Sequence, residues 1–137
     1  MFLTERSMTQ RPLGRPRGGC SVARSPISQN VFNVTGRIEA LLYVKGRAEQ
    51  PYRWGVTANV VERLRRQAQR WFVVLLFESV NTGYLLSSED VLGYVRGTWP
   101  LGTDGDYKPA SGTYLVNNMP FASFDEFIRQ LRGGSVS

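Results

Sequence analysis

The hydrophobic positions of the chain form two kinds of pattern, and the first kind predicts strands. The run WFVVLLF at residues 71–77 is apolar at every position, which is typical of a strand buried on both faces of a sheet. Two apolar segments, residues 30–36 and 38–46, are separated by a glycine-containing turn and predict a β-hairpin. The sequence NTG then leads into YLLSS at residues 84–88, which we interpret as a hairpin partner of the 71–77 strand.

The second kind of pattern has the period of a helix and predicts three helices. Thr57 can cap the segment ANVVERLRRQAQR, whose apolar residues share one face and whose arginines share the other. A short helix is predicted at residues 89–95, after two serines that can cap it. Ser123 and Glu126 form a capping box at the start of the third helix. The apolar positions are Val60, Val61, Leu64 and Ala68 in the first helix, and Phe124, Phe127, Ile128 and Leu131 in the third.

The elements follow the order β-β-α-β-β-α-(β)-α, where the bracketed strand is a short one at residues 113–117. This order predicts one α/β domain over residues 29–132, with a mixed sheet, an N-terminal β-hairpin and flanking helices. Residues 1–28 contain RPLGRPRGG and no apolar periodicity, so we expect a disordered basic arm. Residues 133–137 are expected to form a flexible tail.

Composition limits the chemistry. The chain has no histidine and one cysteine, which excludes histidine-based triads, an internal disulfide and a zinc site of several cysteines. No apolar run is long enough to span a membrane and no secretory signal is visible, so we expect a cytoplasmic protein without a membrane partner. Of the net charge of +6, residues 1–24 contribute +4, from five arginines and one glutamate. Such an arm either attracts nucleic acid or is simply soluble.

Lysine is rare in this chain, which has fifteen arginines and only two lysines, Lys45 and Lys108. Lys45 ends the second strand of the predicted hairpin, in the sequence LLYVKGR. A compact ammonium performs tasks that a forked guanidinium does not. A lysine at the end of a strand can also be an ordinary solvated charge. Both interpretations of Lys45 remain open from the residues alone.

The stretch QNVFNVTGRIEALLYVKGR resembles the restriction-endonuclease-like nucleases, the PD-(D/E)xK superfamily. In that family an aspartate opens the second core strand, and the next strand carries Glu or Gln, one further residue and then Lys. A helix and a buried strand follow. The stretches VKGRAEQPYRWGVT, TGYLLSSEDV and GDYK also look like small nuclease-like domains that retain this hairpin. The resemblance covers roughly residues 29–131 and implies a restriction-endonuclease-like core that lacks its first helix.

Carried over residue by residue, the resemblance matches Lys45 to the family's lysine. Asn30 stands where the aspartate belongs, and Tyr43 stands where Glu or Gln belongs. Nuclease chemistry of this kind needs two carboxylates to hold Mg²⁺, which activates a water for attack on the phosphodiester. Glu39 is the other acid nearby, but it lies about 13 Å along the strand from Tyr43. We therefore expect lost or weak cleavage, no certain cofactor, and Mg²⁺ as the cofactor if activity remains.

The resemblance implies nucleic acid, and DNA in particular, as the partner. Arg63, Arg66 and Arg70 can contact phosphates, although the same pattern is typical of the solvent face of an amphipathic helix. Arg53 and Trp54 can bind a nucleic acid through charge and base stacking, although loop aromatics often cover the edge of a core. The alternative function is a non-enzymatic interaction module that retains the nuclease fold and binds a protein partner or a second copy.

Overall fold

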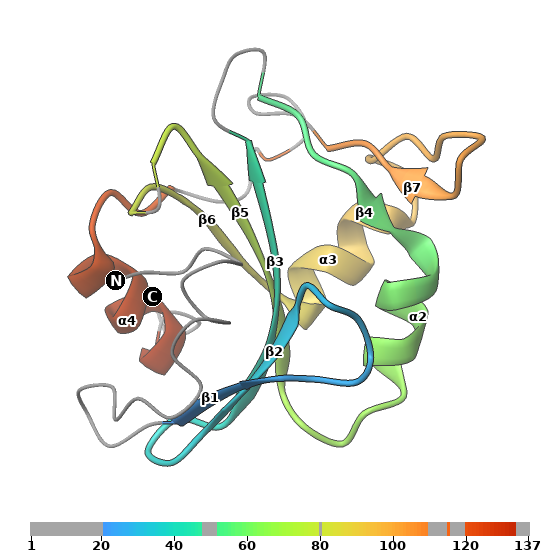
Figure 1. Ribbon diagram of the computed structural model, residues 1–137. Helices are drawn as coiled ribbons and strands as arrows, with labels where there is room; N and C mark the ends of the chain where they lie inside the picture. The colour runs from blue at the N-terminus through green and yellow to red at the C-terminus, as the bar shows by residue number, and fades with distance from the viewer. Residues whose placement is uncertain (1–20, 48–51, 80, 110–114, 116–119, 134–137) are drawn as a thin grey trace.

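The computed structural model describes residues 21–47, 52–79, 81–109, 115 and 120–133. They form a mixed five-stranded sheet with helices on both sides (Figure 1), as the predicted α/β class requires. The strand order is β1-β2-β3-β5-β6, and a separate two-stranded sheet pairs β4 with β7. The strands are β1 (Ser21–Arg24), β2 (Val31–Thr35), β3 (Ala40–Arg47), β4 (Val56–Thr57), β5 (Trp71–Phe77), β6 (Gly83–Ser87) and β7 (Asp106–Tyr107), and the helices are α2 (Ala58–Arg65), α3 (Ser88–Val95) and α4 (Phe124–Gly133).

Strand β5 lies inside the sheet because its side chains are apolar on both faces. Its first six residues are buried. It runs parallel to β3, with Lys45 beside Leu75, and antiparallel to β6, with Val73 beside Leu86. The predicted strand buried on both faces and its hairpin partner are therefore confirmed.

The predicted N-terminal hairpin is also confirmed. Strands β2 and β3 pair antiparallel, from Val31 opposite Tyr43 to Val34 opposite Ala40. The connection contains Gly36 at a φ of 117°, a backbone conformation that glycine adopts without a steric penalty. The turn at Gly36 and the apolar side chains of both strands are thus compatible with this pairing.

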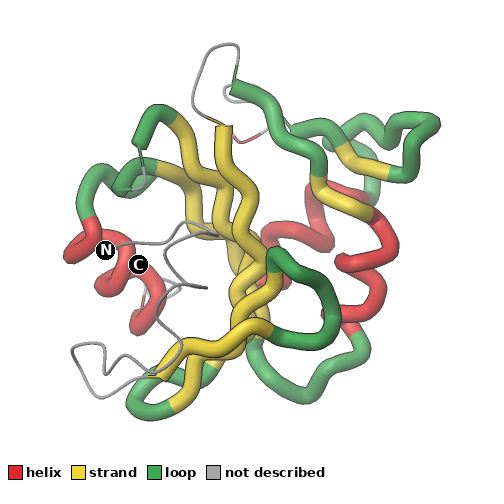
Figure 2. The backbone as a smooth tube through the Cα atoms, viewed as in Figure 1, coloured by secondary structure: helices red, strands yellow, loops and turns green. Residues whose placement is uncertain are grey.

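Alternation along the strands divides the core into two layers. The helices lie on both sides of the sheet (Figure 2). One face of the sheet includes Leu41 and Tyr43 of β3 and is covered by α2 and α3, and we call it the α2 face. The other includes Leu42 and Val44 and is covered by α4, and we call it the α4 face. The chain therefore builds a three-layer arrangement around a sheet that is apolar on both sides.

Helix α2 is shorter than its sequence predicts. Thr57 is its N-cap residue, but the Thr57 side chain makes no capping hydrogen bond, and the carbonyl of Gly105 accepts from the Ala58 N–H instead. The helix ends at Arg65, and Ala68, predicted on its apolar face, is exposed beyond the helix end. The chain leaves the helix here because it must reach the start of β5 beside Leu41 of β3, where the Arg70 carbonyl accepts from the Leu41 N–H.

The other two helices start close to their predicted positions. Ser87 and Asp90 form a complete capping box at the start of α3. At the start of α4, the Ser123 hydroxyl accepts a hydrogen bond from the Glu126 N–H. The Glu126 carboxylate accepts from the N–H of Ala122 rather than of Ser123, so the predicted box is shifted by one residue.

The prediction that residues 1–28 form a disordered arm is wrong for its last part. Ser21–Arg24 form β1, which pairs antiparallel with β2 at the edge of the sheet. Backbone hydrogen bonds hold this strand, and of its side chains only Val22 is partly buried, so no apolar alternation marks it in the sequence. Residues 1–20 and 134–137 lie outside the described residues, as does the strand predicted at 113–117 apart from Leu115, which is buried.

A hairpin projects from the body beside the start of α2 (Figure 1). Leu101 and Tyr107 form a bridge across it, and Tyr107 also pairs with Val56 of β4.

Among the described helices, the longest has ten residues, and none is long and apolar enough to cross a membrane.

Candidate functional site

The ends of β3 and β5 meet at one edge of the sheet because the two strands run parallel. Lys45 is half-buried beside Leu75, and Arg47 is exposed beside Phe77. In open α/β sheets, ligands bind in the crevice outside the carboxyl ends of the strands. This edge is therefore the natural place to look for a binding site. We call the group formed by Lys45, Arg47, Tyr52 and Glu78 the carboxyl edge.

The cations of the carboxyl edge share a face of the sheet. Tyr43, Lys45 and Arg47 occupy every second position of β3, so all three lie on the α2 face. Tyr52 and Phe77 pack against the same layer of the core. Within the described part of the chain, Lys45 makes no hydrogen bond or ion pair.

Glu78 is the carboxylate of this edge, and sequence reasoning missed it. Its N–H donates to the Arg47 carbonyl at 3.1 Å, which extends the pairing of β5 with β3 by one residue. The Tyr52 hydroxyl donates to Oε2 of Glu78 at 3.0 Å, and the Tyr52 ring centroid lies 5.0 Å from that of Phe77. The sequence feature that could have indicated Glu78 as a site residue is its position directly after the buried run 71–77.

Tyr43, the residue that stands in place of the family's Glu or Gln, is a core residue. It is 1% exposed, and its hydroxyl accepts a hydrogen bond from the Thr57 N–H at 3.0 Å. The ring therefore ties β3 to the start of α2. Its oxygen is occupied within the protein rather than presented to a ligand.

Asn30 does not meet Tyr43 on one face. The Asn30 carbonyl accepts from the Val44 N–H at 2.9 Å, which places Asn30 opposite Val44, one position away from Tyr43. By strand alternation, the position opposite Val44 belongs to the α4 face. The structure thus brings Tyr43 and Lys45 onto one face of β3 but does not bring Asn30 to them.

The three arginines predicted to contact phosphate make contacts in different parts of the fold, and of these only Arg70 lies at the beginning of β3. Arg63 donates to the Ile27 carbonyl at 2.7 Å, and Arg66 is the C-cap residue of α2. The Arg70 guanidinium lies 5.0 Å from the centroid of the Phe72 ring, and the Arg70 carbonyl is bonded to Leu41 at the beginning of β3. That point is four residues, or about 13 Å, before Lys45. All three side chains are exposed, but they are not part of the carboxyl edge.

Trp54 covers the core rather than facing a ligand. It is 4% exposed, and its indole N–H donates to the Leu76 carbonyl at 2.9 Å. Its ring meets Phe77 and Tyr84 edge-on. The structure therefore favours the core-edge interpretation of Trp54, whereas its neighbour Arg53 is exposed.

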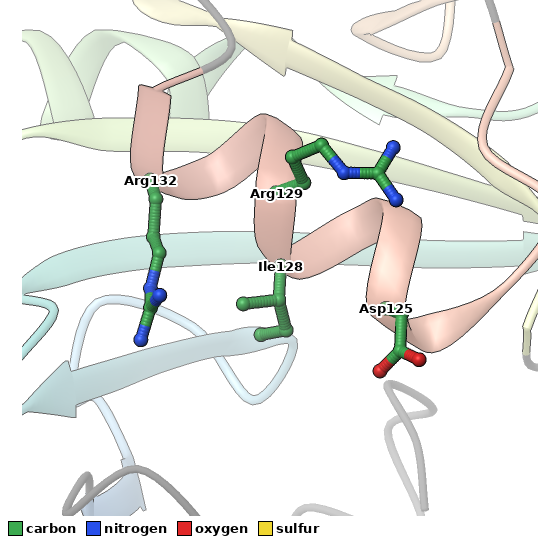
Figure 3. Close-up of a pocket in the computed structure, with 4 residues that line it drawn as sticks. All are labelled: Asp125, Ile128, Arg129 and Arg132. Carbon is green, nitrogen blue, oxygen red and sulfur yellow. The ribbon is translucent and has the colours of Figure 1, made fainter.

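A surface pocket of about 530 Å³ lies against α4 (Figure 3). In Figure 3 Asp125, Ile128 and Arg132 project to one side of the helix, and Arg129 extends away from them. Because α4 packs on the α4 face, this pocket is on the opposite side of the sheet from Lys45. None of the residues predicted from the sequence to form a site is among its described lining residues.

The described residues do not fit a nuclease magnesium site. No group of three or more Asp, Glu or Cys side chains within the described ranges lies close enough together to hold a metal ion. At the carboxyl edge Glu78 is the one described carboxylate, and Asn30 and Tyr43 supply neither charge nor a shared pocket. The two-carboxylate arrangement that the resemblance implies is therefore not formed by its expected positions.

The carboxylate of Asp104, in the projecting hairpin, is bonded within the hairpin. Lys108 donates to Asp104 at 2.6 Å, and this hydrogen bond lowers the pKa of the Asp104 carboxyl below its ordinary value. The second oxygen of Asp104 accepts from the Asp106 N–H. The second lysine of the chain therefore has a structural partner, in contrast to Lys45.

No family model matches the chain, and no match is found among curated proteins. The function must therefore be inferred from the residues and their geometry.

Proposed function

We propose that this chain is a nuclease-like nucleic-acid-binding domain, with DNA the expected ligand, in which metal-dependent cleavage is lost or weak. The observation that carries the proposal is Lys45. It is half-buried at the end of β3, beside the parallel strand β5, and makes no ion pair within the described residues. A backbone phosphate would supply the missing negative charge.

Physical chemistry supports this assignment. Removing a charge from water costs free energy unless the charge is paired, so a partly buried ammonium favours binding of an anion. Arg47, two residues along on the same face, adds a second positive charge. Charges placed in this way bind phosphates without reading bases.

The order of elements also supports the proposal. A hairpin, a helix and a buried strand follow one another as β2, β3, α2 and β5, which is the order that the nuclease resemblance implies. Lys45 lies on the second strand of the hairpin, as in the family's motif.

The expected loss of cleavage is supported by the same geometry. Tyr43 is buried and hydrogen-bonded to Thr57, and Asn30 lies opposite Val44. Neither is a charged oxygen ligand, and hard cations such as Mg²⁺ are held by carboxylates and other oxygen ligands in close array.

A non-enzymatic interaction module is the alternative, and β1 favours it. This short strand forms one edge of the described sheet, and three of its four residues are exposed. The backbone groups of an edge strand can pair with a strand of another chain.

The two functions separate by salt dependence. We would measure gel shifts with single- and double-stranded DNA at about 50 mM and about 200 mM salt. Phosphate binding weakens steeply between these concentrations because bound counterions are released. The nucleic-acid proposal is overturned if neither DNA binds at low salt, and the interaction module then remains. Cleavage is tested by incubating plasmid DNA with the protein and Mg²⁺, with EDTA as the control. Robust Mg²⁺-dependent cutting would contradict the proposal that cleavage is lost or weak.

A further inference from the structure

Glu78 has a backbone conformation that glutamate rarely adopts. Its φ is 66°, and it is the one residue other than glycine with a positive φ in the described ranges. This left-handed conformation brings Cβ close to backbone atoms, so glycine or asparagine is the usual choice. Residues held in such conformations cluster at functional sites. The strained position of a charged side chain therefore raises the question of what the carboxylate does.

Two hydrogen bonds position Glu78, one at its backbone and one at its carboxylate. Its backbone is bonded to Arg47 at 3.1 Å, and Tyr52, packed on Phe77, donates to Oε2 at 3.0 Å. Because Tyr52 and Phe77 pack against the α2 face, the carboxylate is on the same side of the sheet as Lys45. Its other oxygen, Oε1, accepts no hydrogen bond from a described residue.

A fixed carboxylate beside phosphate-binding cations discriminates between nucleic acids. It repels phosphates, and it can only accept hydrogen bonds. The sugar-phosphate backbone of DNA offers no donor between its ends, whereas RNA offers one 2′-hydroxyl in every nucleotide. Lys45 and Arg47 are about 7 Å apart along β3, and Arg47 adjoins Glu78. The carboxyl edge therefore has two cations that can bind a phosphate, Lys45 and Arg47, followed by a carboxylate that can accept a hydrogen bond from the neighbouring sugar hydroxyl.

We infer that Glu78 is the specificity-determining residue of the carboxyl edge, where it accepts a hydrogen bond from a ribose 2′-hydroxyl and gives RNA an advantage over DNA. The inference rests on the proposed nucleic-acid binding but changes its expected ligand, because RNA rather than DNA becomes the favoured nucleic acid. Lys45 and Arg47 bind the phosphates of either polymer. The Glu78 carboxylate repels the phosphates of both polymers and so weakens the binding of DNA. RNA recovers the lost affinity because its 2′-hydroxyl donates a charge-assisted hydrogen bond to the carboxylate.

The test compares three single strands of one sequence: DNA, RNA and 2′-O-methyl RNA, which lacks the hydroxyl proton. Binding is measured by fluorescence anisotropy for the natural chain, Glu78→Gly and the control Glu62→Gln. Glu62 is also exposed but lies on α2, where it pairs with Arg65. We expect the natural chain to bind RNA about tenfold more tightly than the other two strands. Glu78→Gly should bind all three equally, and Glu62→Gln should keep the preference.

The glycine variant separates function from stability. Glycine suits a positive φ, so Glu78→Gly should unfold at a urea concentration equal to or above that of the natural chain. Equal binding of RNA and DNA by the natural chain, or a preference that survives in Glu78→Gly, would overturn the role of Glu78 alone. The absence of binding to all three strands, or binding unaffected by Lys45→Ala, would overturn the proposed function itself.

Discussion

The hydroxyl of Tyr43 accepts a hydrogen bond from the backbone N–H of Thr57 at 3.0 Å. Thr57 is the N-cap residue of α2, so this bond ties the second strand of the hairpin to the helix that follows it. The resemblance to the nucleases matches Tyr43 to a position that carries Glu or Gln. In this chain the Tyr43 side chain is buried and serves the packing of the core, so its hydroxyl is not presented to a metal ion.

Tyr43→Phe should destabilise the protein by about 1–2 kcal/mol, because the Thr57 N–H loses its acceptor in a largely apolar setting. The measurement is urea unfolding. Tyr107→Phe is the matched control, because Tyr107 is only partly buried and its hydroxyl makes no hydrogen bond within the described residues. An equal loss in both variants would contradict the importance of the Tyr43 bond.

Placing the acids of the nuclease motif at the two matched positions should damage the fold rather than form a metal site. In the pair Asn30→Asp and Tyr43→Glu, the second change puts a carboxylate at a position that is 1% exposed. An unpaired buried charge costs several kcal/mol, so we expect a loss of about 3 kcal/mol or more. Urea unfolding with and without Mg²⁺ is the measurement. A variant of natural stability that gains stability from Mg²⁺ would show that the two positions can converge.

Ser87→Ala should cost about 1 kcal/mol, because the Ser87 hydroxyl and the Asp90 carboxylate cap each other's backbone at the start of α3. Ser88 is the next residue and makes no capping bond within the described residues, so Ser88→Ala is its control. Thermal unfolding of the two variants checks the difference. Equal melting temperatures would indicate that water replaces the cap.

The sequence predicted those parts of the fold that side-chain burial determines. The run Trp71–Phe77 is apolar at every position because both of its faces are covered, and the hairpin strand Ala40–Arg47 is likewise buried on both faces as far as Val44. Strand β1 was missed because backbone pairing holds it and its side chains are mostly exposed. The end of α2 was missed because tertiary geometry, not propensity, requires the chain to turn back toward Leu41.

The site was harder to predict than the fold, because a site depends on which faces and ends coincide. Lys45 was predicted as a site residue from its position at a strand end, and the structure places it there. Glu78 was not, because no short motif reports a positive φ or a hydrogen bond from a residue 26 positions away. For Trp54 the sequence left two interpretations open, because it does not show that the indole N–H reaches the Leu76 carbonyl.

The hydrogen bond from Lys108 lowers the pKa of Asp104, and this predicts a direction for the pH dependence. A carboxyl whose pKa is lower in the folded protein than in the unfolded chain contributes stability above the unfolded value, near 3.9. That contribution is lost as the pH falls through the folded value. In a ¹³C NMR titration, the Asp104 carboxyl should titrate below 3.9, and Lys108→Ala should raise the midpoint. An unchanged midpoint in that variant would contradict the role of Lys108.

Lys45→Ala should weaken DNA binding and make it less sensitive to salt. If Lys45 neutralises one phosphate, removing it reduces the slope of log affinity against log salt by about one. Lys108→Ala is the control, because it removes the chain's other lysine from a hairpin where Asp104 already neutralises it. The measurement is fluorescence anisotropy at four or more salt concentrations.

The comparison of the two lysines distinguishes a site from a general attraction. Both variants lower the net charge of +6 by the same amount, so an effect of charge alone would be equal for both. A specific site at the end of β3 predicts a loss of affinity for Lys45→Ala and little change for Lys108→Ala. Equal losses would assign the binding to the overall charge. An unaffected Lys45→Ala variant would make Lys45 a solvated strand end, and the half-buried position of its side chain would then have only a packing explanation.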